Sequence, residues 1–351
     1  MKNQLVLEGV DFKALVSAVC RFPAIGSVKG ADTVSVMATK GRAIATTASI
    51  LEARAVVPGE GDLFWTAVDR RALESYASIC RDSGKVTVTV DKNMVLSHRK
   101  REVTLQVSAS VKVEKPVLGE GVEIDKATAE KLAYLSYVAF DDATRIELNC
   151  VFLTGTHAIA CDQKTIAKLK VRLPVEGSAV PLMLAKAIAA GDVLYIGKQT
   201  VLKSGIATYA MPSLVKAQSS FPLGKIAAYE EDEKTKVGTL VAEKFKMVIE
   251  ECAAVLSALA RTEIVVDLTL EGEQLSFAAQ NAGVVYRMSL ALSGASCERR
   301  IFRVPLASLV HVAPFMVGKV VLLMGSRSDL FLDLGDGWAF FSAWVPDKKR
   351  G

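Results

Sequence analysis

The stretch Arg145–Ala167, RIELNCVFLTGTHAIACDQKTIA, lies in the middle of the chain and predicts a β-hairpin. Two apolar runs flank the turn-forming residues Thr154-Gly155-Thr156, and Asp162-Gln163 supplies a second turn. Segments with the same order of elements occur about one third of the chain earlier and one third later. The stretch is therefore expected to be one sheet portion of a repeated unit.

Each third of the chain shows the order strand, helix and three strands twice. In the first third, residues 3–8 predict a strand, and Asp11 is expected to cap the helix that follows. Residues 63–68 predict a second strand, and Asp69 is expected to cap a second helix. Apolar residues then recur at helical spacing, for example Phe12, Leu15, Val16 and Val19, and later Phe245, Val248, Ile249 and Cys252. Helices with one apolar stripe pack on a sheet. The pattern predicts an α+β fold with helices on one face of antiparallel sheets.

Two segments rich in charge, glycine or proline predict domain boundaries, Lys112–Gly121 and Glu230–Lys236. They divide the chain into three similar tandem domains, residues 1–115, 116–236 and 237–351. A length of 351 residues suits two or three domains, and 51% hydrophobic with 23% charged residues excludes a mostly disordered chain.

The chain lacks the features of a membrane or secreted protein. No apolar run approaches the ~20 residues that a membrane helix needs, and the N-terminus lacks the apolar core of a signal peptide. We therefore expect a cytoplasmic location and no membrane partner. The six cysteines form no CxxC pair and lie in or beside apolar runs, which predicts buried free thiols: Cys20, Cys80, Cys150, Cys161, Cys252 and Cys297.

The sequence offers little for catalysis. Its three histidines, His98, His157 and His311, have no Cys, Asp or Glu neighbours at metal-ligand spacing, and no phosphate-binding glycine motif occurs. No catalytic residue, metal or cofactor is therefore predicted. Cys161-Asp162 resembles a nucleophile beside an acid, but Asp162 also stands where a hairpin needs a turn residue.

Basic residues fall opposite the apolar stripes of the predicted helices in every third of the chain. They are Lys13, Arg21, Arg70, Arg71, Arg81, Lys126, Lys131, Lys186, Lys244 and Lys246. One interpretation is ordinary solvated helix faces. The other is a common surface that binds DNA phosphates without reading bases, if the helices of all three units face one way.

Four segments, in this order and at these spacings, resemble the bacterial-type DNA polymerase sliding clamp, the DNA polymerase III beta subunit family. They are DRRALESYASICR (69–81), IELNCVFLTG (146–155), IACDQKTIAKL (159–169) and SSFPLGKI (219–226). The resemblance covers essentially the whole chain. Identities are sparse, which indicates a divergent member such as a phage-encoded clamp.

The resemblance implies the DNA clamp fold and a head-to-tail homodimer that encloses double-stranded DNA without sequence preference. Helices would line the inner face and sheets the outer face. It also implies an apolar pocket for peptides of the DNA polymerase and the clamp loader. Carried over position by position, that pocket comprises Leu148, Ile166, Pro222, Ile226, Ala343, Val345 and Pro346.

The working hypothesis is a sliding clamp, a non-enzymatic processivity factor in DNA replication. One alternative is an interaction scaffold that has the clamp fold but does not encircle DNA, which predicts a monomer in solution. A second alternative is an enzyme with a site near Cys161 and Asp162.

Overall fold

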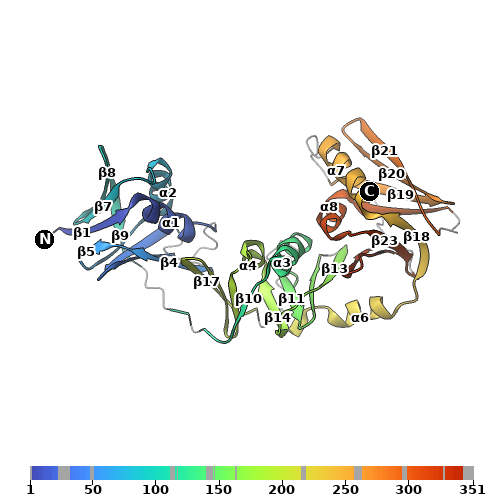
Figure 1. Ribbon diagram of the computed structural model, residues 1–351, viewed down its shortest axis with the longest axis horizontal. Helices are drawn as coiled ribbons and strands as arrows, with labels where there is room; N and C mark the ends of the chain where they lie inside the picture. Colours follow the sequence, from blue (N-terminus) through green and yellow to red (C-terminus); the bar gives the residue numbers. More distant parts are fainter. Residues whose placement is uncertain are drawn as a thin grey trace, which may run out of the picture. The chain divides into compact units, whose positions relative to one another are not determined.

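The chain folds into two compact units in the computed structural model (Figure 1). Unit 1 comprises Met1–Lys126 and Ile188–Ser213, and unit 2 comprises Ala127–Ala187 and Leu214–Gly351. The structure describes residues 2–22, 32–47, 51–110, 115–116, 118–139, 145, 147–162, 164–214, 219–256, 263–294, 299–326 and 329–342. The division into domains 1–115, 116–236 and 237–351 stays a prediction.

One antiparallel sheet runs through unit 1. In sheet order its strands are β10 (Gly121–Glu123), β15 (Val193–Ile196), β16 (Gln199–Ser204), β17 (Ala207–Pro212), β4 (Glu52–Pro58), β3 (Arg42–Thr47), β2 (Thr33–Thr39), β6 (Phe64–Asp69), β9 (Arg101–Ser108), β8 (Asn93–His98), β7 (Lys85–Val90), β1 (Asn3–Glu8) and β5 (Glu60–Gly61). Pairing of β4 with β17 joins the first and middle thirds of the chain.

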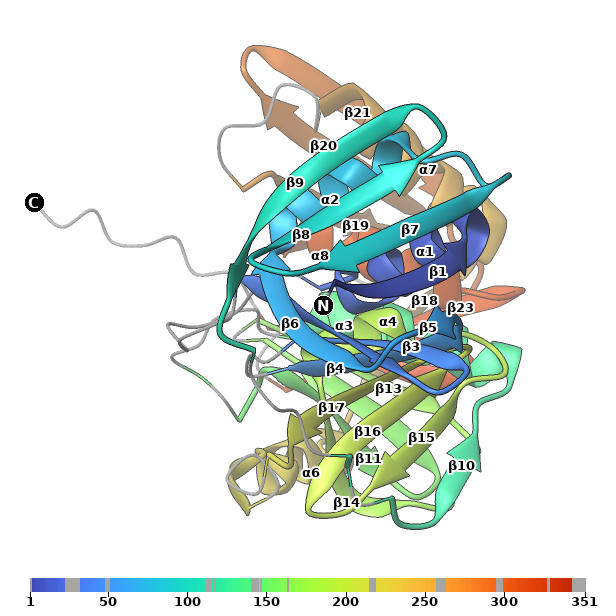
Figure 2. The same cartoon turned by 90° about the vertical axis from the view of Figure 1, so that its left-hand side faces the viewer.

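Helices α1 (Gly9–Val19) and α2 (Arg70–Ile79) cover one face of this sheet, behind strands β1, β7 and β8 in Figure 2. The predicted apolar stripe of α1 is confirmed, because Phe12, Leu15, Val16 and Val19 are at most 3% exposed. Phe12 meets Tyr76 of α2 edge to face, with ring centroids 6.0 Å apart. The two helices therefore share one core with the sheet.

The two predicted helix caps have different outcomes. Asp69 caps α2 as predicted, since its Oδ1 accepts a hydrogen bond from the Ala72 N–H at 2.8 Å. The prediction for Asp11 is wrong, because α1 begins two residues earlier. Its first amides donate to backbone carbonyls of a distant turn: Gly9 N–H to Gly84 O at 2.8 Å and Val10 N–H to Asp82 O at 3.1 Å.

Gly9 also permits this close approach of two backbones. A Cβ at this position would collide with the Arg81 carbonyl oxygen. The start of α1 is therefore determined by tertiary contact with the turn after α2 rather than by a local side-chain cap.

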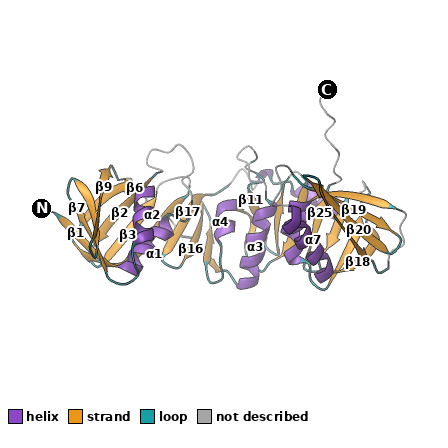
Figure 3. Cartoon of the chain, turned by 90° about the horizontal axis from the view of Figure 1, so that it is seen from above, coloured by secondary structure: helices purple, strands orange, loops and turns teal. Residues whose placement is uncertain are grey.

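Unit 2 contains two antiparallel sheets (Figure 3). The larger has the order β14 (Glu176–Pro181), β11 (Cys150–Thr154), β12 (His157–Cys161), β13 (Thr165–Lys170), β25 (Gly337–Phe341), β24 (Leu330–Asp333), β23 (Lys319–Met324) and β18 (Thr235–Val241). The smaller has the order β21 (Val284–Ala291), β20 (Gln274–Asn281), β19 (Val265–Glu271) and β22 (Arg300–Pro305).

Helices cover both faces of the larger sheet. The helices of unit 2 are α3 (Lys126–Val138), α4 (Leu182–Ala187), α6 (Leu223–Glu231), α7 (Ala242–Leu256) and α8 (Leu306–Val312), followed by the 3₁₀ turn η2 (Ala313–Phe315). In Figure 1, α6 lies on the opposite side of β11 and β14 from α3 and α4. Among the described residues, no helix is both long enough and apolar enough to cross a membrane.

The predicted hairpin in Arg145–Ala167 is confirmed as β11 and β12, with Gly155 at φ 84° in the turn. Asp162 forms the second turn, since its Oδ1 accepts hydrogen bonds from the Lys164 and Thr165 amides at 2.6 and 2.5 Å. From Cys150 to Leu153 every residue is buried, with no alternation between the two faces. Both faces of this part of the sheet are therefore covered.

Four elements were absent from the sequence prediction, the short strands β5 and β10, strand β14 and helix α6. The charged segment Glu230–Lys236, expected to be a boundary, holds the end of α6 and the start of β18. The predicted linker Lys112–Gly121 lies partly outside the described residues. The α+β fold with helices packed on antiparallel sheets is as predicted, except that α6 lies on the second face of the larger sheet, where no helix was expected.

The cap at Asp69 gives a first testable prediction. Asp69→Ala removes the acceptor for the Ala72 amide, so we expect unfolding of unit 1 to become easier by about 1 kcal/mol. Urea unfolding followed by far-ultraviolet circular dichroism would measure this. Lys92→Ala, an exposed change in the turn between β7 and β8, is the control and should stay within about 0.5 kcal/mol of the parent. An equal loss in both variants would contradict the assignment of the cap.

Candidate functional site

The face of the larger sheet beneath α6 carries a cluster of apolar side chains from well-separated segments of the chain. The cluster includes three predicted pocket residues, Leu148, Ile166 and Ile226, at 7%, 8% and 2% exposure. Phe152 of β11 stacks on Phe221, just before α6, with ring centroids 4.6 Å apart. Residues far apart in sequence are thus brought together, and they are buried rather than open to solvent.

The edge of this cluster is more accessible. Pro222 is half-buried at the start of α6, where its carbonyl accepts the Ile226 amide at 3.0 Å, and Leu214 is half-buried beside the cluster. The other predicted pocket residues, Ala343, Val345 and Pro346, lie outside the described residues. Pro222 and Leu214 are therefore the more accessible residues at this cluster among those that the structure describes.

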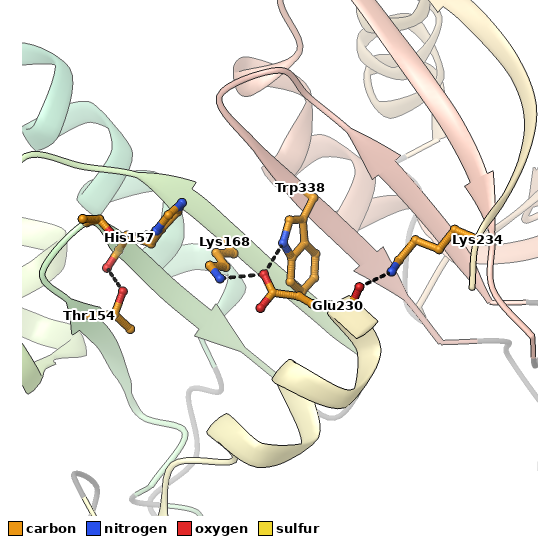
Figure 4. Close-up of polar contacts among 7 residues, drawn as sticks. Thr154, His157, Lys168, Glu230, Lys234 and Trp338 are labelled. Atoms are coloured by element: carbon orange, nitrogen blue, oxygen red, sulfur yellow. Dashed lines mark hydrogen bonds and ion pairs between the residues drawn. The ribbon is translucent and has the colours of Figure 1, made fainter. Parts of the chain in front are cut away.

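Polar contacts at the other end of α6 fasten that helix to the sheet (Figure 4). Glu230 Oε1 lies 2.5 Å from Lys168 Nζ and accepts the Trp338 indole N–H at 2.9 Å. Lys234 Nζ donates to the Glu230 carbonyl at 2.9 Å and lies 4.7 Å from the centroid of the Phe331 ring. This network joins α6 to β13, β24 and β25.

Glu230 is held in its charged form. Partial burial opposes ionisation, but the hydrogen bonds from Lys168 and Trp338 outweigh it and lower the pKa of Glu230 below its ordinary value of 4.5. Sequence reasoning missed this network because its members are up to 170 positions apart. The only local signal was the charged run that begins at Glu230.

The surroundings of Cys161 do not favour catalysis. Cys161 is 2% exposed, and burial, followed by the nearby Asp162, raises the pKa of its thiol to about 12. A thiol that stays protonated at neutral pH is a poor nucleophile. Within the described ranges, no group of three or more His, Cys, Asp or Glu side chains could hold a metal ion.

Comparison with solved structures places this arrangement in a known fold. A DNA polymerase sliding clamp from Caulobacter crescentus matches with a TM-score of 0.80 and 12% identity, over 97% of this chain and 99% of that chain. A Helicobacter pylori beta clamp bound to a DNA ligase peptide matches with a TM-score of 0.77 and 13% identity, over 97% and 100%.

The chain has the fold of the bacterial sliding clamps. A third example is the Pseudomonas aeruginosa sliding clamp (DNA polymerase III subunit beta) bound to griselimycin, with a TM-score of 0.76 and 13% identity over 98% and 100%. No protein-family model and no curated protein matches the sequence. The resemblance inferred from four short segments is confirmed for the fold, and the low identities agree with a divergent sequence.

In unit 1 of this clamp fold, several of the predicted DNA-binding residues are used within the unit. Lys13 Nζ lies 2.6 Å from Asp82 Oδ1. Arg70 is 8% exposed and donates to the Cys20 carbonyl at 2.5 Å and to the Phe22 carbonyl. Arg21 lies over the rings of Phe22 and Tyr209, 5.9 Å from each centroid. Arg71 and Arg81 are exposed.

Unit 2 shows the same division between structural and exposed cations. Lys131 Nζ lies 2.7 Å from Asp336 Oδ2 and donates to the Lys170 carbonyl at 2.9 Å. Lys246 is half-buried, whereas Lys186 and Lys244 are exposed, as is Lys126 at the boundary of unit 1. Helices α3 and α7 also carry the acids Glu130, Glu243, Glu250 and Glu251, so the charge of these two helices is mixed rather than basic. That these cations contact DNA stays a prediction, from which we leave out Arg70 because it is buried.

The Glu230 network predicts a pH-dependent stability. Folding lowers the pKa of Glu230. The stabilisation from its contacts is therefore complete above about pH 4.5 and is lost as the pH falls through the folded pKa. Between pH 6 and pH 3 the parent protein should therefore lose more unfolding free energy than Glu230→Gln. Urea unfolding monitored by tryptophan fluorescence at each pH measures the difference.

Glu233→Gln, at an exposed glutamate just after α6, is the control and should follow the parent curve. If Glu230→Gln also follows the parent curve, the contacts with Lys168 and Trp338 do not stabilise the charged carboxylate.

Proposed function

We propose that this protein is a DNA sliding clamp, a ring that encircles duplex DNA and tethers a DNA polymerase to its template. The observation that carries the proposal is the extent of the structural likeness, which covers 97% of this chain and 99% of the Caulobacter crescentus clamp. A clamp acts by enclosure and needs no catalytic centre. The buried, protonated Cys161 agrees with a non-enzymatic role.

Ring closure requires a surface that joins two chains, and β21 offers one. Among the described strands, β21 pairs only with β20, so its outer edge has unpaired backbone groups. Such edges pair readily with another strand. Val285 and Met288 on β21 are 46% and 37% exposed, which supplies apolar area to bury. We infer that β21 of one chain meets the first domain of a second chain, head to tail.

The cluster beneath α6 is the proposed binding site for the polymerase and the clamp loader. Leu148, Ile166 and Ile226 form its floor, and Pro222 stands at its edge. The Helicobacter pylori clamp, which shares the fold, holds a DNA ligase peptide. In this chain, a peptide would insert an apolar side chain beside Pro222 and displace part of the start of α6.

Inside the ring, the exposed cations Arg71, Arg81 and Lys244 are the proposed phosphate contacts. Their interaction with DNA would be sequence-independent and screened by salt. The acids on the same helices keep it weak, which suits a ring that must slide. A cytoplasmic location goes with this role.

The proposed use of β21 predicts the oligomeric state. The parent protein should sediment as two chains at micromolar concentration, and the pair of changes Val285→Lys and Met288→Lys should shift it to one chain by placing charge at the edge. Ile301→Lys on β22, at a 52% exposed residue on the other edge of the same sheet, is the matched control and should remain dimeric. A parent protein of one chain would favour the scaffold alternative instead.

Retention on DNA tests the function directly. Protein assembled on a nicked circular plasmid should co-elute with it in gel filtration, and cutting the plasmid once should release the protein from the ends. The β21 double variant is the control and should not be retained on either template. Equal retention on circular and linear plasmid would contradict the proposal. A ring can slide off a free DNA end, whereas a protein that binds the DNA surface is retained equally on both templates.

A further inference from the structure

A cavity of about 420 Å³ opens on the α6 face of the larger sheet in unit 2. The cavity lies beside Lys170, at the opposite end of β13 from Ile166. At ~3.3 Å per residue along a strand, Lys170 is about 13 Å from Ile166. The lining of the cavity includes His157, Phe331 and Trp338 from neighbouring strands, and Glu230 and Lys234 from the end of α6 and beyond. The cavity therefore adjoins the cluster beneath α6, because Phe331 belongs to that cluster and Trp338 packs against it, but it opens at the opposite end of β13 from Ile166.

The walls of this cavity are fixed before any ligand arrives. Lys168 and Trp338 hold Glu230 at 2.5 and 2.9 Å, and Lys234 Nζ donates to the Glu230 and Asp232 carbonyls at 2.9 and 3.1 Å (Figure 4). The end of α6 is thus fastened to the strands below. A site with preformed walls binds with less loss of conformational entropy.

The cavity has an aromatic and apolar wall. Trp338 is half-buried, and its ring centroid lies 6.1 Å from that of Phe331, with half-buried Leu323 next to them. The indole N–H already donates to Glu230, so the exposed part of the ring is left for contact with an apolar or aromatic group.

Two of the three carboxylates that line the cavity form ion pairs with lysines of the protein. Glu230 pairs with Lys168, and Asp336 pairs with Lys131 at 2.7 Å. Asp333 is exposed and its Oδ1 accepts the Gly335 amide at 2.9 Å. These carboxylates would repel a polyanion such as nucleic acid.

Lys170 is a basic residue at the rim of the cavity. It is exposed, and across the described parts of the chain its ammonium group makes no ion pair. Burial, and then the charges of Lys168 and Lys170, lower the pKa of His157, so this ring is neutral at pH 7. The aromatic wall thus stands beside the exposed ammonium group of Lys170, whereas Lys234, the other lysine of the lining, donates to two backbone carbonyls.

We propose that this cavity binds a short peptide segment of a partner protein, with an aromatic side chain against Trp338 and a carboxylate at Lys170. A volume of about 420 Å³ suits a few side chains. One carboxylate next to an aromatic ring matches the pattern of wall and charge, whereas a strand of phosphates would meet Asp333 and Asp336. The proposal does not depend on ring closure.

The test uses the full-length protein and two fluorescein-labelled hexapeptides, Gly-Ser-Phe-Glu-Leu-Gly and Gly-Ser-Phe-Lys-Leu-Gly, followed by fluorescence anisotropy. The acidic peptide should bind about tenfold more tightly than the basic one, and Lys170→Glu should weaken the acidic peptide by about tenfold. Lys236→Glu on β18, an exposed lysine of the same sheet, is the matched control and should leave binding unchanged.

A second variant separates a binding role from simple damage to the fold. Asp333→Asn keeps an acceptor for the Gly335 amide and removes a negative charge from the rim, so it should tighten the acidic peptide severalfold. Equal binding of the two peptides, or an acidic peptide indifferent to both Lys170→Glu and Asp333→Asn, would overturn the proposal. Lys170→Glu should leave the sedimentation mass unchanged, which separates this result from failure of the clamp proposal.

Discussion

Hydrogen-bonded ladders between strands from different thirds of the chain are the interaction on which the rest of the structure depends. β4 pairs with β17 in unit 1, and β13 pairs with β25 in unit 2. Because β13 and β25 are adjacent, apolar residues of the middle and last thirds share one sheet face, which α6 covers. The contact of Leu148, Ile166 and Ile226 with Phe331 and Phe340 in one cluster is a consequence of that pairing.

The sequence predicted most of what is local. Apolar spacing located α1, α2 and α7, the run of residues 146–161 predicted the hairpin, and Asp69 was identified as a cap. What it missed depends on long-range contact. The start of α1 is set by carbonyls of Asp82 and Gly84, more than 70 positions away, and α6 is held by Lys168 and Trp338. No local pattern encodes such partners.

The candidate site shows the same limit. The resemblance to clamps predicted pocket residues of which Leu148, Ile166 and Ile226 lie together in the structure. Only the structure shows that they are buried beneath α6. Lys13, Arg70 and Lys131 are basic residues on helices, and so are Arg71 and Lys244. The first three differ only in partners that are distant in sequence, Asp82, the Cys20 carbonyl and Asp336. Charge on a helix face can be read from sequence, whereas its neutralisation cannot.

The mixed charge of the helices bears on how a clamp of this kind would hold DNA. Strong phosphate contacts raise affinity, but each must break before the protein moves along the duplex. With Lys131 and Lys13 engaged in ion pairs and Glu243, Glu250 and Glu251 beside Lys244, electrostatic attraction alone would be weak. Retention would then rest on the closed ring. In the proposed ring, the strength of the proposed β21 contact, rather than the charge facing the DNA, would set how long the protein stays loaded.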